Sequence, residues 1–202
     1  MATISSFMGS VQTVRKKQLK RILKIFWIFI LIFSLSSCDE KENISNEQIS
    51  STDETYTKAQ VIRVIDGDTI WVDIGGKKEK VRFIGINTPE LARDGKKAQF
   101  MAEEARDFVE KTIKDKEIYL EKDLTDMDKY DRLLRYIYLE KPSNDPSFED
   151  IRDKSLNGIL VKEGYAYSNY YKPNIKYQDF LEKLEDEAKE NRLGIHSKKN
   201  RK

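Results

Sequence analysis

Four short polar segments in the middle of the chain combine carboxylates, an amide and two arginines. They are Ile65-Asp-Gly-Asp-Thr69, Val81-Arg-Phe-Ile-Gly85, Asn87-Thr-Pro-Glu90 and Asp128-Lys-Tyr-Asp-Arg132. Carboxylate and amide oxygens can hold a hard cation, and two arginines can grip a phosphate through paired hydrogen bonds. One further carboxylate remains to accept a proton. Together the segments supply the groups required to attack a phosphodiester.

The candidate metal ligands lie in two of these segments. Asp68 follows Gly67 at the start of a predicted strand and is the first candidate. Asn87 could add its side-chain oxygen and Thr88 its backbone carbonyl. Each also has an ordinary explanation, because Asp68 could cap its own turn and Asn-Thr-Pro is a common turn sequence.

The candidate phosphate ligands and general base have alternatives of the same kind. Arg82 lies within an apolar strand, where an unpaired charge is costly, so it needs a partner. That partner is a phosphate, Asp68 or Glu90. Glu90 follows Pro89, which restrains the local backbone, and is a general base or an exposed acid at a helix entrance. Arg132 follows a turn-like segment and is a phosphate ligand or a solvated surface arginine.

The first 37 residues have the pattern of a secretory signal. They carry six basic residues and no acidic one, and an apolar run over residues 25–35 leads to Leu35-Ser-Ser-Cys38. The run is eleven residues long, whereas a membrane-spanning helix needs ~20, so a signal is favoured over a permanent membrane helix. The Leu-Ser-Ser-Cys ending resembles the lipobox of bacterial lipoproteins, which implies cleavage before Cys38 and lipid on its sulfur. Plain secretion is the alternative.

Composition divides the remainder of the chain into three parts. Residues 38–56 are acidic and rich in Ser and Asn, which predicts a flexible tether. Residues 57–198 have the length of one globular domain, and residues 199–202 form a basic tail. Without the signal, 31 bases face 35 acids, a net charge of −4. Any affinity for phosphates must therefore come from local placement and not from overall charge.

Hydrophobic periodicity in the domain predicts a small α+β barrel of the kind that binds oligonucleotides. Strands are expected over 59–65, 69–74, 80–86, 118–121 and 133–139, with a hairpin turn at Gly75-Gly76 and helices over 98–112, 156–164 and 177–188. The period of two predicts that Arg82, Ile84 and Ile86 share one face of their strand. Residues 140–154 contain two prolines and read as an irregular loop.

Residues 57–198 resemble the staphylococcal nuclease (thermonuclease) family. The resemblance rests on Ile65-Asp-Gly-Asp-Thr69, Arg82-Phe-Ile-Gly-Ile-Asn-Thr-Pro-Glu90, Asp128-Lys-Tyr-Asp-Arg132, Leu156-Asn-Gly-Ile-Leu-Val161, Gly164-Tyr-Ala166 and Tyr171-Lys-Pro-Asn174, in this order. It implies a five-stranded OB-fold barrel with three helices. It also implies a calcium-dependent endonuclease that cleaves DNA and RNA with little sequence preference and leaves 3′-phosphate ends. The alternative is a catalytically weak nucleic-acid-binding module of the same fold.

The resemblance assigns roles by position. It implies that Asp68, Asn87 and Thr88 bind Ca²⁺, that Arg82 and Arg132 stabilise the phosphoryl charge, that Glu90 is the general base, and that Lys129, Tyr130 and Tyr171 contact the nucleotide. It also predicts a cis peptide bond, or a mixture of isomers, before Pro173. We expect a monomer that meets a membrane only through the lipid on Cys38.

Three positions depart from the best-known member of the family. Asn87 replaces an aspartate, so its amide oxygen can coordinate but one negative charge is lost. Asp131 and Leu133 replace glycines beside Arg132, which predicts a stiffer loop. His196, the only histidine, replaces a tryptophan, and because it lies outside all four polar segments we expect it to be structural.

Overall fold

The protein was analysed as a computed structural model, which describes residues 55–197. The predicted signal, Cys38, the tether up to residue 54 and the basic tail lie outside these residues. The tether prediction is wrong at its end, because Tyr56 already belongs to the first strand, where it is 9% exposed. Between residues 55 and 197 no helix combines the length and apolar character needed to cross a membrane.

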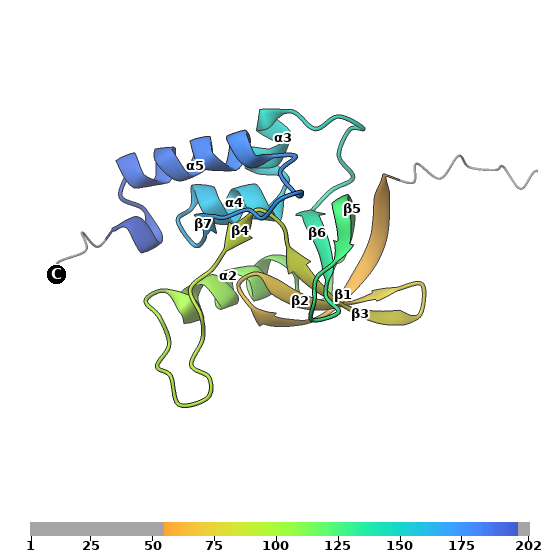
Figure 1. The fold of residues 1–202 in the computed structure, drawn as a ribbon, viewed down its shortest axis with the longest axis horizontal. Coiled ribbons are helices and arrows are strands. Elements are labelled where there is room, and N and C mark those ends of the chain that lie inside the picture. Colours follow the sequence, from red (N-terminus) through yellow and green to blue (C-terminus); the bar gives the residue numbers. More distant parts are fainter. Residues whose placement is uncertain (1–54, 198–202) are drawn as a thin grey trace, which may run out of the picture. The chain divides into compact units, whose positions relative to one another are not determined.

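Five strands close into a barrel, which confirms the predicted α+β barrel fold (Figure 1). They are β1 (Tyr56–Asp66), β2 (Thr69–Ile74), β3 (Lys77–Phe83), β5 (Glu117–Met127) and β6 (Leu133–Tyr138), in the order β1-β2-β3-β6-β5. The first three form the predicted antiparallel meander, and the positive φ angles at the β2–β3 turn, 60° and 91°, explain the Gly75-Gly76 pair. A parallel pairing of β3 with β6 closes the barrel.

The strand expected over residues 80–86 stops at Phe83. Gly85 has φ 75°, a conformation that side chains disfavour, and a Cβ there would lie 2.7 Å from Leu181. The backbone therefore turns, and the prediction that Arg82, Ile84 and Ile86 share a face is wrong. Ile84 and Ile86 are buried in the core, whereas Arg82 remains half-buried on the outer face. Ile86 and Asn87 instead form β4 (Ile86–Asn87), which pairs with β7 (Tyr167–Ser168).

The described helices are α2 (Ala102–Ile113), α3 (Phe148–Asp153), α4 (Leu156–Lys162), α5 (Gln178–Glu190) and the 3-10 helix η1 (Gly194–His196). Helix α2 begins later than expected because Met101, its N-cap, has φ 70°. Helix α3 was not predicted, since its segment read as an irregular loop. Ser147 and Asp150 form a reciprocal capping box there, which stabilises the start of even a short helix.

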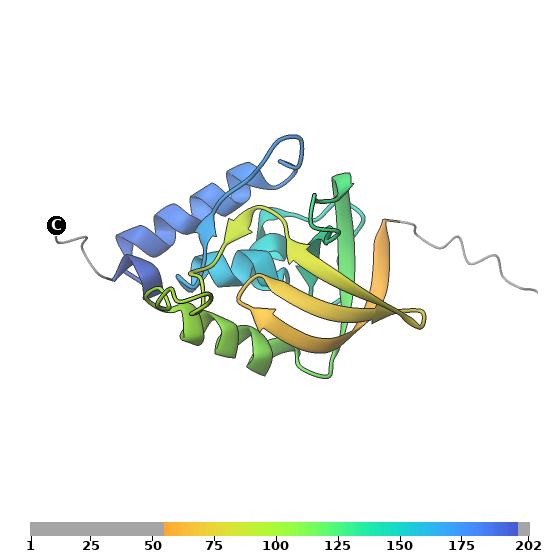
Figure 2. The ribbon, with the colours of Figure 1, turned by 60° about the horizontal axis from the view of Figure 1, so that its bottom comes forward.

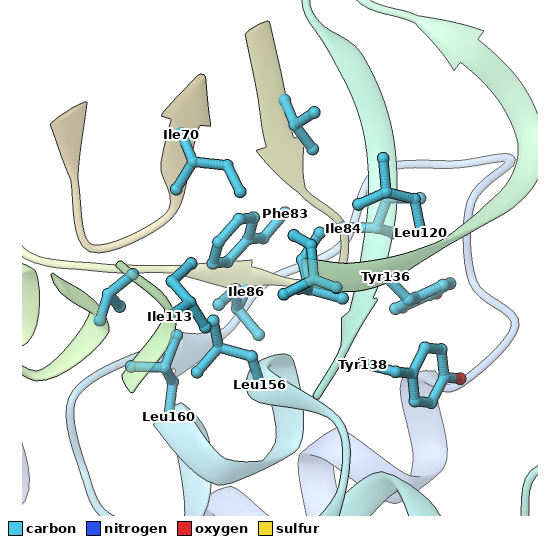
Figure 3. Close-up of a cluster of buried hydrophobic side chains, with 14 of the residues drawn as sticks. Ile70, Phe83, Ile84, Ile86, Ile113, Leu120, Tyr136, Tyr138, Leu156 and Leu160 are labelled. Atoms are coloured by element: carbon cyan, nitrogen blue, oxygen red, sulfur yellow. The ribbon is translucent and has the colours of Figure 1, made fainter. Parts of the chain in front are cut away.

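The hydrophobic core lies between the barrel and α4. Figure 3 shows Leu156 and Leu160 of α4 directed toward Phe83 of the barrel and Ile86 of β4. In the same helix Asn157, fully buried, accepts from the Ile137 N–H (2.9 Å) and donates to the Ile84 carbonyl (2.8 Å). Because these two bonds tie α4 to β6 and to the turn after β3, they fix the point where the chain leaves the barrel for the candidate site.

Candidate active site

Asp68, in the short connection between β1 and β2, is bound to the segment that follows β4. Its carboxylate accepts the Thr88 N–H (3.0 Å) and the Thr69 hydroxyl (3.0 Å), and its side chain is 7% exposed. A Cβ at Gly67 would lie 2.7 Å from the Thr88 methyl group. Glycine is therefore required for Thr88 to approach this closely, and two predicted metal ligands twenty residues apart lie together.

Arg82 is held by four contacts on the outer side of β3. Its Nη2 lies 3.0 Å from an Asp68 carboxylate oxygen and donates to the Asn87 side-chain oxygen (3.0 Å), while Nη1 donates to the carbonyls of Phe83 (2.6 Å) and Ile86 (3.0 Å). The sequence left open a partner for Arg82, and Asp68 is that partner here. Among residues 55–197 only the Nε–H of this guanidinium has no acceptor, so a phosphate gripped by two N–H groups must displace an existing contact.

The oxygen donors around Asp68 fit a hard cation. Asp66 lies beside it, and its carboxylate accepts the Asp68 N–H (3.2 Å). Burial, followed by repulsion from Asp68, raises the pKa of Asp66 to about 6. A divalent cation would relieve this repulsion, and the oxygens of Asp68, Asn87 and Thr88 are of the type that Ca²⁺ prefers. In the described part of the chain no three His, Cys, Asp or Glu residues form a metal cluster, so the amide and carbonyl oxygens are needed to complete the set.

Glu90 is exposed, and its backbone is fixed by Gln99. The Glu90 N–H donates to the Gln99 side-chain oxygen (2.9 Å), and the Gln99 N–H donates to the Glu90 carbonyl (2.9 Å). Within residues 55–197 the Glu90 carboxylate has no hydrogen-bond or ion-pair partner. It does not pair with Arg82, and it is free to accept a proton. Sequence reasoning missed Gln99, since a single glutamine nine residues away carries no pattern.

Asp128 organises the loop that carries Arg132. Its Oδ2 accepts from Nε (2.7 Å) and lies 2.7 Å from Nη2 of Arg132, while its Oδ1 accepts the backbone N–H groups of Tyr130 (2.9 Å) and Arg132 (3.1 Å). Burial alone would raise the pKa of Asp128, but the hydrogen bonds from Arg132 and from the Tyr130 backbone lower it below its ordinary value. Asp131 adopts φ 57° in this turn, a conformation suited to the glycine it replaces. Asp128 was part of the recognised segment, but sequence reasoning gave it no role.

The parallel pairing of β3 and β6 brings the two arginines to the same region of the barrel. Val81 pairs with Leu133 and Arg82 with Leu134. Val81 and Leu133 are buried, so Arg82 and Arg132, which alternate with them, point outward. Arg132 immediately precedes β6, so two arginines fifty residues apart in sequence lie at neighbouring positions of the barrel, one in β3 and one in the loop that enters β6.

The predicted substrate residues are exposed. Lys129 lies 5.0 Å and the Arg132 guanidinium 5.5 Å from the Tyr130 ring centre, and Tyr130 is 66% exposed. Tyr171, 74% exposed, belongs to a separate turn, in which the Lys172-Pro173 peptide bond is cis as predicted.

The Tyr171 turn is attached to β5. The Thr125 N–H donates to the Asn174 side-chain oxygen (2.8 Å) and the Lys176 N–H donates to Asp123 (3.1 Å). Among the described residues Tyr171 has no hydrogen bond or ring contact with Tyr130 or Arg132. The two predicted substrate-binding tyrosines therefore belong to separate turns that do not contact each other.

His196 has the structural role that the sequence predicted. In η1 it packs edge-on against Tyr167, with ring centres 5.5 Å apart. Burial lowers its pKa below the ordinary value. This packing lies at β7 and the C-terminal helix, and His196 has no contact with the polar segments among the interactions of residues 55–197.

Comparison with known proteins identifies the family. Residues 80–198 match the family model of the staphylococcal nuclease homologues. The thermonuclease of Staphylococcus hyicus is 34% identical over 168 residues, which span 83% of this chain and 91% of that protein. The chain belongs to the staphylococcal nuclease family. Other members are the thermonuclease of Staphylococcus intermedius, 37% identical over 146 residues (72% of this chain, 80% of that protein), and endonuclease YncB of Bacillus subtilis (strain 168), 38% identical over 138 residues (67% and 60%).

In this member of the staphylococcal nuclease family, some of the candidate site residues lie in the range matched by the family model, and the structure connects the others to them. The matched range includes Arg82, Glu90 and Arg132. Asp68 precedes that range, and the structure places it through its contacts with Thr88 and Arg82. The roles of individual residues remain predictions, which the variants described below test.

Proposed function

We propose that this protein is a calcium-dependent endonuclease that hydrolyses DNA and RNA with little sequence preference and leaves 3′-phosphate ends. That the protein is a nuclease that hydrolyses phosphodiester bonds follows from its membership in a family whose members include thermonucleases and an endonuclease. The calcium requirement and the 3′-phosphate products are the proposed additions.

One observation carries the proposal: the buried Asp68 carboxylate joins Thr88 and Arg82 in one constellation. Asn87 is attached to the same group through Arg82. Oxygen donors for a cation and the Arg82 guanidinium are thus in contact before any substrate arrives. A phosphate would then bind Arg82 in exchange for one of its present acceptors, beside a bound cation that also neutralises charge.

Each side chain then has a defined task. Calcium held by Asp68, Asn87 and Thr88 would supply charge neutralisation at a phosphoryl oxygen. Glu90, exposed and unpaired within the described residues, accepts a proton from the attacking water. Arg82 and Arg132 neutralise the charge that develops on the phosphoryl group.

The exposed tyrosines fit a substrate of any sequence. Tyr130 and Tyr171 present more than half of their surface to solvent. Stacking on an aromatic ring tolerates all bases, because every base has a π-face. Little sequence preference follows from this kind of contact.

The alternative is a module that binds nucleic acid without cleaving it. The presence of Arg82, Glu90 and Arg132 together with Asp68 favours the enzyme, because a binding module needs no general base. A gel digestion of single-stranded DNA separates the two. We expect cleavage with calcium, none with a chelator, and none for Glu90→Gln; binding without cleavage under all conditions would support the module.

We also propose that the enzyme is a lipoprotein held at the outer face of the cytoplasmic membrane through Cys38, with secretion as the alternative. The basic segment, the short apolar run and the Leu-Ser-Ser-Cys ending support this. Two acyl chains anchor a protein stably where one does not. The domain would act as a monomer, and the residues between Cys38 and β1 would let it reach nucleic acid near the membrane surface.

A further inference from the structure

The outer face of β3 carries a row of cations that continues from Arg82. Val81 and Phe83 point into the core and are almost fully buried. Lys78, Lys80 and Arg82 alternate with them and therefore lie on the outer face. Successive residues of this row are separated by about 7 Å along the strand.

The neighbouring strands add an aromatic ring and a further cation to the same face. Trp71 of β2 lies opposite Lys80, and Arg63 of β1 lies opposite Trp71. Trp71 is only half-buried, although Ile70 and Val72 on either side of it are fully buried. Its indole therefore faces outward between two cationic side chains. Figure 2 shows this β2–β3 hairpin projecting from the barrel.

The charges on this face are not neutralised. In the described part of the chain Arg63, Lys78 and Lys80 have no carboxylate within ion-pair distance. Lys77, at the hairpin end of the same strand, differs because it pairs with Glu79. The acid Asp73 also faces outward, directly opposite Lys78, and accepts the N–H of the hairpin turn (2.7 Å). Even with Asp73 counted, the face carries more positive than negative charge.

Lys80 also lies beside the second catalytic arginine. Val81 pairs with Leu133 in the parallel β3–β6 ladder. Continuing this register by one residue brings Arg132 alongside Lys80. Lys80 is therefore two residues from Arg82 on its own strand, and it immediately precedes Val81, whose partner Leu133 immediately follows Arg132.

We propose that the outer face of β1–β3 is a binding track for single-stranded nucleic acid, in which Lys78, Lys80 and Arg63 contact successive phosphates and Trp71 stacks on a base. The inference rests on the proposed nuclease function and extends it, since the track holds the strand beyond the bond that is cleaved. Cations along a strand with an outward aromatic ring are the pattern of sequence-independent single-strand binding. An anionic lipid surface would require the same charges, but the row runs directly to the catalytic arginines, which favours a polynucleotide.

The test measures binding of full-length protein to a labelled single strand of ~20 nucleotides in chelator at several salt concentrations. Replacing both Lys78 and Lys80 with glutamine should reduce the salt slope by ~1.4 and weaken binding up to ~25-fold at ~0.1 M salt, since each phosphate contact contributes ~0.7 to the slope. Lys77→Gln is the matched control, because it removes a neighbouring charge that is already paired. It should leave the slope unchanged.

A second pair of variants tests the aromatic contact. Trp71→Leu should weaken binding at least ~5-fold, and Trp71→Phe should retain most of the affinity, as stacking on a ring requires. Thermal melting of both variants separates loss of the contact from loss of the fold. Equal affinities for Trp71→Leu and Trp71→Phe with intact folds would overturn the stacking assignment.

Two further results would overturn the track itself. The first is a salt slope for strand binding that is unchanged in the Lys78/Lys80 variant. The second is a Lys78/Lys80 variant that no longer binds anionic phosphatidylglycerol vesicles but still binds the single strand as the wild type does, which would assign the face to a membrane. Cleavage of the strand by wild-type protein with calcium tests the proposed function separately. If the wild-type protein did not cleave the strand but bound it through Lys78 and Lys80, the proposed nuclease activity would be disproved and the binding track would stand.

Discussion

Replacing Asp128 with alanine should lower nuclease activity through Arg132, although Asp128 itself contacts no substrate in the proposed mechanism. The Asp128 carboxylate holds two nitrogens of the Arg132 side chain and two backbone N–H groups of its loop. Without it, the arginine must be ordered by the substrate alone. An arginine side chain has about 2 kcal/mol of rotamer freedom, which corresponds to a loss of about 30-fold in kcat/KM.

The same change should cost little stability. Asp128 and Arg132 are 17% and 23% exposed, so water can replace the lost acceptors. We expect the free energy of unfolding to fall by about 1–2 kcal/mol. Asp126→Ala is the matched control, because Asp126 lies on the same strand end and pairs with Arg135 (2.7 Å), which does not belong to the site. It should reduce stability by a similar amount and activity by less than about threefold.

The assay compares initial rates of single-stranded DNA cleavage with calcium and denaturant unfolding for both variants and for Arg132→Ala. If Asp128→Ala retained the activity of Asp126→Ala while Arg132→Ala was inactive, Asp128 would not position the arginine. If all three variants were fully active, Arg132 itself would leave the mechanism.

Four further predictions concern the site and the anchor. Glu90→Gln, Arg82→Ala and Arg132→Ala should each reduce the cleavage rate at least ~10²-fold, measured in saturating calcium; a fully active variant would remove its residue from the mechanism. Asn87→Asp should tighten calcium binding by restoring a charged oxygen; an equal half-saturating concentration for both proteins would mean that Asn87 does not touch the metal. Because the pKa of Asp66 is raised from 3.8 to about 6, the stability that Asp66 contributes without calcium is fully present below its ordinary pKa and falls away as the pH rises through 6. Asp66→Asn should abolish this fall in urea unfolding with chelator, and a pH profile like that of the wild type would contradict the assignment. Cys38→Ser should release the protein into the soluble fraction or leave its signal uncleaved, whereas identical fractionation and N-terminal masses would disprove the anchor.

The local sequence was a good guide wherever a single element decides the outcome. The β-branched runs and the Gly75-Gly76 turn predicted the meander, because alternation and turn chemistry act over a few residues. The end of β3 before Gly85 was missed. Gly85 has φ 75° and lies against Leu181 of a helix nearly a hundred residues away, and no local pattern records such a contact.

The candidate site shows the same division. Residue types and order predicted Asp68, Arg82, Glu90 and Arg132, but they left open whether Arg82 pairs with an acid or awaits a phosphate. The structure shows Arg82 held by Asp68 and Asn87, which answers the question of its acidic partner, whereas its role toward a phosphate stays a prediction. Gln99 had no sequence signal, because its effect arises from two hydrogen bonds to the Glu90 backbone, one through its side-chain oxygen and one through its N–H, that form only after the segment folds back.

The sequence by itself determined which chemical groups this protein has and the family to which it belongs, since both depend on residue identity and order. Only the tertiary structure decided which groups meet. The parallel pairing of β3 with β6 places Arg132 beside the row of cations that ends at Arg82, although the two strands are distant in the chain. The reason is physical: register across a barrel is set by burial of alternate residues on both strands at once, and that condition is satisfied only when the whole barrel closes.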